Sequence, residues 1–309
     1  MKIWDVQQGT LVGELVEEHN YGSNAVNSIA ISPDDRRIVS GGSDKNIIIW
    51  DVESREKEYD LLERHRYCVD SVCFSPDGET FASAGKTSVI IWDTETGTPM
   101  ATIDADPDFV SCVAFSPDGQ KLAYASKVIR VCHVDTAELL LEINDGPDVM
   151  VWSPCGQQIV SGSPDHTVKF WDASNGNQIG KPCEGHTDSI RGLAISPDGS
   201  FIATGSNDNS VRLWSTTTRK QIGPSLPHND YLRCVAISPD GKQLACGDFG
   251  AELSLWYIWG IVQLHFEQEK EQEEFEAEQR LAIVNDGHGA VSDPVVTPES
   301  SQLTRPAWV

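Results

Sequence analysis

A four-residue motif that recurs along the chain constrains its fold more than any other feature of the sequence. Ser-Pro-Asp-Gly, or a near variant, begins at six positions: Ser32, Ser75, Ser116, Ser153, Ser196 and Ser238. Successive copies are separated by 37 to 43 residues. A period of this size is typical of folds in which one small unit is repeated and each unit packs on the next. The sequence therefore predicts a repeat protein.

A second series of positions interleaves with the first. Tryptophan, or in one copy cysteine, stands at Trp4, Trp50, Trp92, Cys132, Trp171, Trp214 and Trp256. Between the two anchors lie short runs of alternating apolar residues broken by turn residues, as in residues 189–204. Such runs predict β-hairpins, because the side-chain period of a strand is two and Pro-Asp-Gly suits a tight turn. We expect an all-β fold with four strands in each unit.

Units of this length with these two anchors resemble WD40 repeats, and the resemblance covers roughly residues 1 to 260. It implies a β-propeller, in which four-stranded sheets, the blades, are set radially and pack face to face. Six full blades and a partial N-terminal blade are expected. The best-preserved unit also has the spacing of the family's buried hydrogen-bonded tetrad, at His186, Thr204, Asp208 and Trp214.

The tetrad is incomplete in the other units. The retained members are Ser40, Asp44 and Trp50; Ser161, Asp165 and Trp171; His65, Ser83 and Trp92; and His228 and Trp256. His186, Thr204 and Asp208 also have the chemistry of a catalytic triad, but the spacing favours the structural role and the chain has no Gly-x-Ser-x-Gly elbow.

The two ends of the chain raise the question of how the ring closes. Residues 1–5 and 10–15 are predicted to be the third and outer strands of the first blade, which then lacks its two inner strands. We expect a propeller over 1–266 and an acidic, helical or disordered tail over 267–309. Alternatively, residues 281–293, which echo the strand and turn at 193–199, supply the missing strands and make seven blades.

Charge and cysteine usage exclude several classes of function. Forty-seven acidic residues against 23 basic ones give a net charge of −24, which opposes binding to nucleic acid or anionic lipid. The sequence shows no secretory signal and no apolar run long enough to span a bilayer, so we expect a cytoplasmic or nuclear protein. Eight cysteines without a C-x-x-C pair predict free thiols rather than disulfides or zinc ligands.

Fragments that resemble catalytic motifs are incomplete. Gly85-Lys86-Thr87 lacks the leading glycine of a phosphate loop, and His265-Phe266-Glu267 has no Pro-Cys-x-x-Cys partner and is expected to be an outer strand. We therefore expect no catalytic residue, cofactor or metal. A propeller hydrolase is the remaining enzymatic alternative, and the apolar inner strands disfavour it.

Partner binding is the function that the resemblance implies. WD40 partners often dock on the rim formed by the loops around each inner strand, and the matching positions here are Asn27, Asp70, Ser111, Asp148, Arg191 and Arg233. Asn207, Tyr231 and Phe249 are expected beside the two arginines, which would form a basic sector that binds an acidic segment of a partner protein. The alternative is that these arginines pair with the chain's own acidic surface.

The leading interpretation is a non-catalytic scaffold for protein–protein interaction. A narrower alternative comes from residues 178–188 and 221–224, which resemble the repeat arrays joined to NACHT-type signalling NTPases in fungi. This resemblance implies a detached sensor propeller.

Overall fold

Antiparallel strands are the main regular elements of the first of the chain's two compact units, Met1–Val262 and Gln263–Val309. The computed structural model describes residues 2–6, 8–14, 19, 25–59, 65–105 and 109–286. The first two sheets contain β1 (Lys2–Asp5) and β2 (Thr10–Glu14), then β3 (Val26–Ile31), β4 (Arg37–Gly42) and β5 (Ile47–Asp51).

The next two sheets have four strands each: β6 (Val69–Phe74), β7 (Thr80–Gly85), β8 (Ser88–Asp93) and β9 (Pro99–Asp104); β10 (Cys112–Phe115), β11 (Lys121–Ala125), β12 (Ile129–His133) and β13 (Leu139–Ile143). The last three sheets are β14 (Val149–Trp152), β15 (Gln158–Gly162) and β16 (Val168–Asp172); β17 (Ile190–Ile195), β18 (Phe201–Ser206), β19 (Ser210–Ser215) and β20 (Gln221–Pro227); and β21 (Leu232–Ile237), β22 (Gln243–Asp248) and β23 (Leu253–Tyr257).

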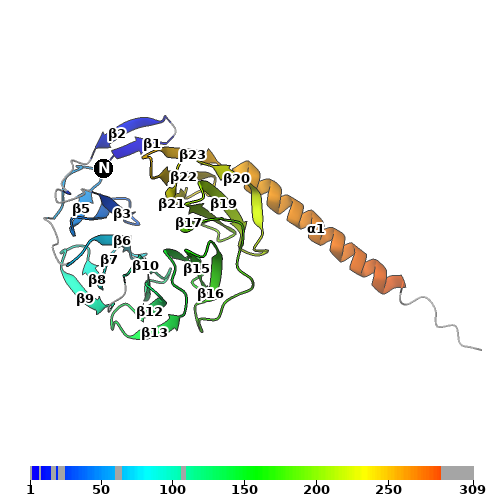
Figure 1. Ribbon diagram of the computed structural model, residues 1–309, viewed down its shortest axis with the longest axis horizontal. Coiled ribbons are helices and arrows are strands. Elements are labelled where there is room, and N and C mark those ends of the chain that lie inside the picture. The colour runs from blue at the N-terminus through cyan, green and yellow to red at the C-terminus, as the bar shows by residue number, and fades with distance from the viewer. Residues whose placement is uncertain are drawn as a thin grey trace, which may run out of the picture. The chain divides into compact units, whose positions relative to one another are not determined.

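The sheets are the blades of a propeller. The first strand of each larger sheet contacts the first strand of the next, in the order β3, β6, β10, β14, β17 and β21. Figure 1 shows these strands around a common centre, with the other strands of each sheet outside them. The predicted all-β propeller is therefore confirmed, with six larger blades and a partial first blade formed by β1 and β2. Three of the six larger blades have three strands in the described residues, not the four that were expected.

Neighbouring blades are held together by aliphatic side chains of the inner strands. Val69 and Val72 of β6 pack on Ile47 and Ile49 of the preceding blade, and all four are buried. Gly41 makes this approach feasible, because a Cβ atom there would collide with the Val69 side chain. The same arrangement recurs at Gly162 with Ile190 and at Gly205 with Leu232.

The recurring Ser-Pro-Asp-Gly motif forms the turn between the inner and second strands. In the β6–β7 turn, Ser75 Oγ donates to Asp77 Oδ1 at 2.6 Å and accepts the backbone N–H of Thr80 at 3.0 Å. Gly78 closes the turn at φ +73°, a conformation that glycine adopts readily. Each motif residue thus has a local role in the turn, which explains why the motif recurs.

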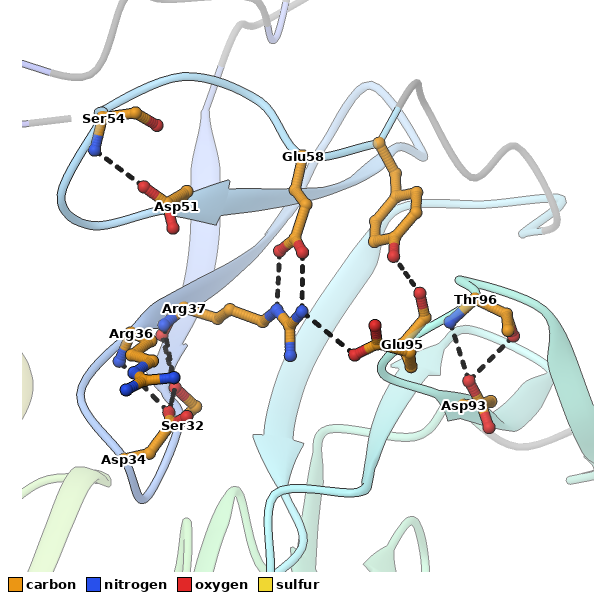
Figure 2. Close-up of polar contacts among 11 residues, drawn as sticks. Ser32, Asp34, Arg36, Arg37, Asp51, Ser54, Glu58, Asp93, Glu95 and Thr96 are labelled. Atoms are coloured by element: carbon orange, nitrogen blue, oxygen red, sulfur yellow. Dashed lines mark hydrogen bonds and ion pairs between the residues drawn. The ribbon is translucent and has the colours of Figure 1, made fainter.

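An ion-pair cluster joins two blades away from the inner strands (Figure 2). Arg37 at the start of β4 binds both carboxylate oxygens of Glu58 at 2.6 Å. The same guanidinium reaches Glu95 of the next blade at 3.2 Å, and the Tyr59 hydroxyl donates to the Glu95 carbonyl. The cluster raises the pKa of Arg37 and ties the β5 side of one blade to the β8–β9 turn of the next.

Two complete tryptophan networks are present in the described residues. In one, Trp214 Nε1 donates to Thr204 Oγ1 at 2.8 Å, and His186 bridges Thr204 (2.8 Å) and Asp208 (2.7 Å). The second contains Trp50, Ser40, Asp44 and His19, with His19 bridging the hydroxyl and the carboxylate. The sequence did not reveal His19, because it precedes its hydroxyl partner by 21 residues, where His186 precedes Thr204 by 18.

One blade uses a carboxylate where three others use His19, His65 or His186. Ser161 accepts from Trp171 Nε1 at 2.9 Å and donates to Asp145 at 2.8 Å. Lys169 Nζ lies 2.8 Å from Asp145 and 2.6 Å from Asp165, so it neutralises the buried charge. Asp165, expected to be the carboxylate of an incomplete tetrad, instead binds Lys169.

The last blade has the rings of the network without its hydroxyl. His228 and Trp256 lie 5.9 Å apart between ring centroids, close to the 6.1 Å of His186 and Trp214. Cys246 occupies the position of the serine or threonine. His228 Nε2 and Trp256 Nε1 are buried without a hydrogen-bond partner, which costs stability.

The residues after β23 form a helix, which corrects two predictions. His265 and Phe266 lie within α1 (Trp259–Asp286), not in an outer strand. Residues 281–286 are also helical rather than strands of the first blade, and 287–293 lie outside the described residues. The run of Glu, Gln, Lys and Ala favours a helix. Side-chain pairs four residues apart, such as Gln263–Glu267 and Lys270–Glu274, add to this preference.

Replacing Cys246 by serine tests the interpretation of the last blade. We expect Cys246→Ser to raise the free energy of unfolding by about 1 kcal/mol, because the hydroxyl supplies partners for His228 and Trp256. Urea unfolding followed by tryptophan fluorescence measures the change. Cys183→Ser is the control, because this thiol is equally buried but outside any such network. An equal gain in both variants would contradict the account.

A pH dependence follows from His65. Burial lowers the pKa of His65 to about 4, whereas the unfolded chain binds that proton near pH 6.5. The free energy of unfolding should therefore fall as the pH decreases from about 6.5 towards 4. We expect His65→Gln to lose less stability than the wild type between pH 7 and pH 5, as measured by urea midpoints. Identical losses would refute this assignment.

Candidate functional site

Six of the nine residues predicted to bind partners lie at the beginning of the inner strands. Each of β3, β6, β17 and β21 carries one as its second residue, and the other two immediately precede β10 and β14: Asn27, Asp70, Arg191, Arg233, Ser111 and Asp148. Because consecutive inner strands are neighbours, these positions follow one another around one end of the propeller. We call this end the rim face.

Hydrogen bonds link several of these positions across blades. Asn27 Nδ2 donates to the backbone carbonyl of Val69 at 3.0 Å and lies 3.4 Å from Asp70 Oδ1. Ser111 Oγ donates to the carbonyl of Pro147 at 3.0 Å, which belongs to the next blade. The rim face is therefore held in place by the same neighbour-to-neighbour contacts that build the ring.

Arg191 pairs with an acidic residue of the preceding blade. Its Nη1 atom lies 3.0 Å from Asp148 Oδ2, and both side chains are partly exposed. Burial raises the pKa of Asp148, and the Arg191 charge opposes that rise. For Arg191, the structure therefore shows the intramolecular pairing that we gave as the alternative to partner binding.

Arg233 has a different environment. Its guanidinium carbon lies 5.1 Å from the centroid of the exposed Phe249 ring. The Phe249 N–H donates to the carbonyl of Tyr231 at 2.8 Å, which places the two aromatic residues together. The backbone of Gly192 lies against Cys234, so Arg191 and Arg233 come from adjacent strands. Asn207, in the β18–β19 turn, donates its N–H to the Ser189 carbonyl.

Sequence reasoning missed two aromatic residues of the rim face. Tyr67 precedes β6 and Phe109 precedes β10, and both side chains are exposed. Lys86 Nζ lies 5.3 Å from the Tyr67 ring centroid, a second contact between a cation and an exposed ring. The signal available in the sequence was an aromatic residue just before the inner strand, as at Tyr231.

Asp70 is the electrostatically unfavourable member of the rim face. Its Oδ2 atom is buried and has no hydrogen-bond partner among the described residues. Burial raises the pKa of Asp70 to about 6, because the carboxylate lacks a compensating cation. The Asp70 carboxylate can accept a hydrogen bond from a bound molecule.

Among the described residues, no three His, Cys, Asp or Glu side chains gather as a metal ion would require. In that same part of the chain, the helix is too polar to cross a bilayer. The cysteines are free thiols, as expected, in the described ranges.

Comparison with known proteins identifies the repeats. The model "WD domain, G-beta repeat" matches residues 9–51, 56–93, 97–131, 146–172, 176–215 and 221–256. A "Ribosome biogenesis protein WDR12 homolog" of Trichoplax adhaerens is 25% identical over 225 residues, 62% of this chain and 52% of the relative. "Small ribosomal subunit protein RACK1" of Drosophila melanogaster is 28% identical over 174 residues, 56% of this chain and 44% of the relative. The chain thus spans about half the length of these relatives, and it belongs to the WD40 repeat family.

Proposed function

We propose that the protein is a non-catalytic scaffold that binds partner proteins on its rim face. The observation that carries the proposal is the exposure of four aromatic side chains at one end of the propeller, two of them next to cations. Aromatic residues and arginine contribute most of the binding energy in typical protein interfaces. A rigid ring that presents them at the ends of its strands offers a preorganised surface.

The partner residues that bind near β21 are acidic. Within the described residues, Arg233 faces the Phe249 ring and has no carboxylate partner, in contrast to Arg191. On a chain with a net charge of −24, this exposed guanidinium attracts a carboxylate of a partner segment. A bound carboxylate also competes with Asp148 for Arg191, which frees a second donor.

The relatives bear on the class of partner. Their names refer to ribosome biogenesis and to the small ribosomal subunit. The negative charge of this chain favours a protein over RNA as its direct partner, because phosphate binding requires a surplus of basic residues. The resemblance of its repeats to the arrays of NACHT-type NTPases, and with it the sensor role, stays a prediction.

Charge reversal at the two arginines tests the proposed function. We expect Arg191→Glu with Arg233→Glu to abolish the capture of partner proteins, as identified by affinity purification and mass spectrometry, with only a small fall in melting temperature from the loss of the partly exposed Arg191–Asp148 pair. Arg36→Glu with Lys121→Glu is the matched control, since these cations lie near the turns at the other ends of the inner strands. Capture that survives the first double reversal, or is lost equally in both, would show that the rim face is not the binding surface.

Asp70 gives a second test of the rim face. Because its folded pKa of about 6 lies above the value of about 4 in an unfolded chain, ionised Asp70 costs stability above pH 6. Asp70→Asn should therefore raise the free energy of unfolding by about 1 kcal/mol at pH 7, and this gain should disappear as the pH falls to about 4. Asp148→Asn should gain less, because Arg191 compensates Asp148. A gain independent of pH would contradict the assignment.

A further inference from the structure

In the part of the chain that the structure describes, one sector of the ring has no inner strands. β1 is paired with β2 alone, and its other edge has no strand partner among the described residues. Figure 1 shows this pair in the sector between the β3–β5 and β21–β23 blades. By their position relative to the tryptophan anchor, β1 and β2 correspond to β8 and β9 of a complete blade. Among the described residues, no strands correspond to β6 and β7 in this sector.

The β3 wall of this sector is apolar and uncovered. Ile29 of β3 corresponds to Val72 of β6, three residues before the Ser-Pro-Asp-Gly motif in each unit. Val72 is 5% exposed because it packs on the preceding blade, whereas Ile29 is 56% exposed. Val26 and Ile31, on either side of Ile29 along β3, are exposed as well.

The opposite wall, formed by the last blade, has the same character. Leu253 and Leu255 of β23 correspond to Ile47 and Ile49 of β5, which are fully buried by the inner strand of the next blade. Leu255 is 48% exposed. Two apolar walls that face one open sector thus lack the side chains that cover their counterparts elsewhere.

Gly247 shows what kind of side chain would fit there. The corresponding glycines, Gly41 and Gly205, are each contacted by an aliphatic side chain of the following inner strand. At Gly247, the atoms within 4 Å of an added Cβ include only the Sγ of Cys234, from the same blade. No aliphatic side chain of a following inner strand covers Gly247 in the described residues, and only the Cys234 thiol lies against it.

Trp4 gives an independent indication on the β1 side. Trp214, at the same position of a complete blade, is 2% exposed and donates to a threonine hydroxyl of the second strand. Trp4 is 47% exposed. Its indole has no such hydroxyl in the described part of the chain, because the strand that would carry it is missing.

We propose that this open sector binds a β-hairpin of a partner protein, which completes the first blade. The inner strand of the hairpin carries two aliphatic side chains three residues apart, one of them over Gly247. The second strand pairs with the free edge of β1 and places a serine or threonine beside Trp4. The same pattern covers the other blades, as in β17–β18 with Ile190, Leu193 and Thr204.

The occupant follows from continuity with the established interfaces between blades. Both walls repeat surfaces that neighbouring blades cover elsewhere: the counterpart of the β23 wall packs on an inner strand, and the counterpart of the β3 wall packs on a second and a third strand. A helix would not satisfy the edge of β1, whose backbone groups require a strand. A second copy of this chain has its own strand pairs committed to its six larger blades, so it supplies no free hairpin in the described residues.

A peptide with the sequence of residues 190–206 is the probe, because it contains the β17–β18 strand pair. The thiol of Cys234 is a suitable reporter of binding in this sector. Ser28, at the corresponding position of β3, contacts the next blade, whereas Cys234 is exposed, so we expect a bound hairpin to cover it. Alkylation of the full chain is followed residue by residue by mass spectrometry. At a peptide concentration ten times its Kd, we expect alkylation of Cys234 to slow about tenfold and the melting temperature to rise.

Two controls make the outcome specific. Cys155, the other exposed thiol in the described residues, should keep its reactivity when the peptide binds. Leu255→Glu should abolish the protection, whereas Leu139→Glu should not, because Leu139 is similarly exposed but lies on the outer strand β13. A scrambled peptide should have no effect.

Several results would overturn the proposal. They are the absence of protection by the peptide, equal protection of Cys155, or protection that survives Leu255→Glu. Slow alkylation of Cys234 in the free chain would show that the sector is already filled. Light scattering would then identify the occupant: a dimeric mass would indicate a second copy of this chain, and a monomeric mass would indicate a segment of the same chain. The test uses purified chain and peptide, so its outcome does not depend on partner capture at the rim face.

Discussion

The packing of aliphatic side chains from one inner strand onto the preceding blade is the interaction on which the rest of the structure depends. A sheet of three or four short strands has two faces and cannot bury them by itself. Val69 and Val72 cover the face of the preceding blade, and Gly41 allows the two blades to approach closely. Because every blade needs its neighbour, the ring positions residues far apart in sequence at one end, which creates the rim face.

The polar networks differ between blades while this packing stays constant. Threonine or serine receives the tryptophan N–H in four blades, yet the group behind the hydroxyl is His186 in one and Asp145 with Lys169 in another. A hydrogen-bonded indole and hydroxyl stabilise these four blades, and several residue types meet this need. The last blade, with Cys246, does not meet it and also borders the open sector. Its stability is therefore expected to be the lowest of the larger blades.

Much of the fold could be predicted from the sequence, because the features that set it are local and periodic. The Ser-Pro-Asp-Gly turns and the tryptophan positions locate most strands. His19 and Asp145 were missed because their loops differ in length, so that no fixed spacing identifies them. Residues 281–286 show the limit of similarity between short segments: they echo a strand, but continue a helix whose composition strongly favours it.

The positions of the candidate site residues could be predicted from the sequence, but their ion pairs and ring contacts could not. Counting from the turn motif placed Arg191 and Arg233 at the ends of adjacent strands. Which of them binds a carboxylate depends on the lateral contact with another blade, and only the structure gives the 3.0 Å approach of Asp148 to Arg191. The relation between exposed Phe249 and Arg233 is equally a matter of side-chain geometry.

Native-state hydrogen exchange tests the central claim most directly, because it measures the stability of each blade in the intact chain. If each blade is stabilised by its neighbours, the amides of β7, β11, β15 and β18 should exchange slowly, and those of β22 and β1 should exchange fastest among the strands. Uniform protection of β22 and β18 would contradict the account, since it would mean that a blade beside the open sector is as stable as one packed on both faces.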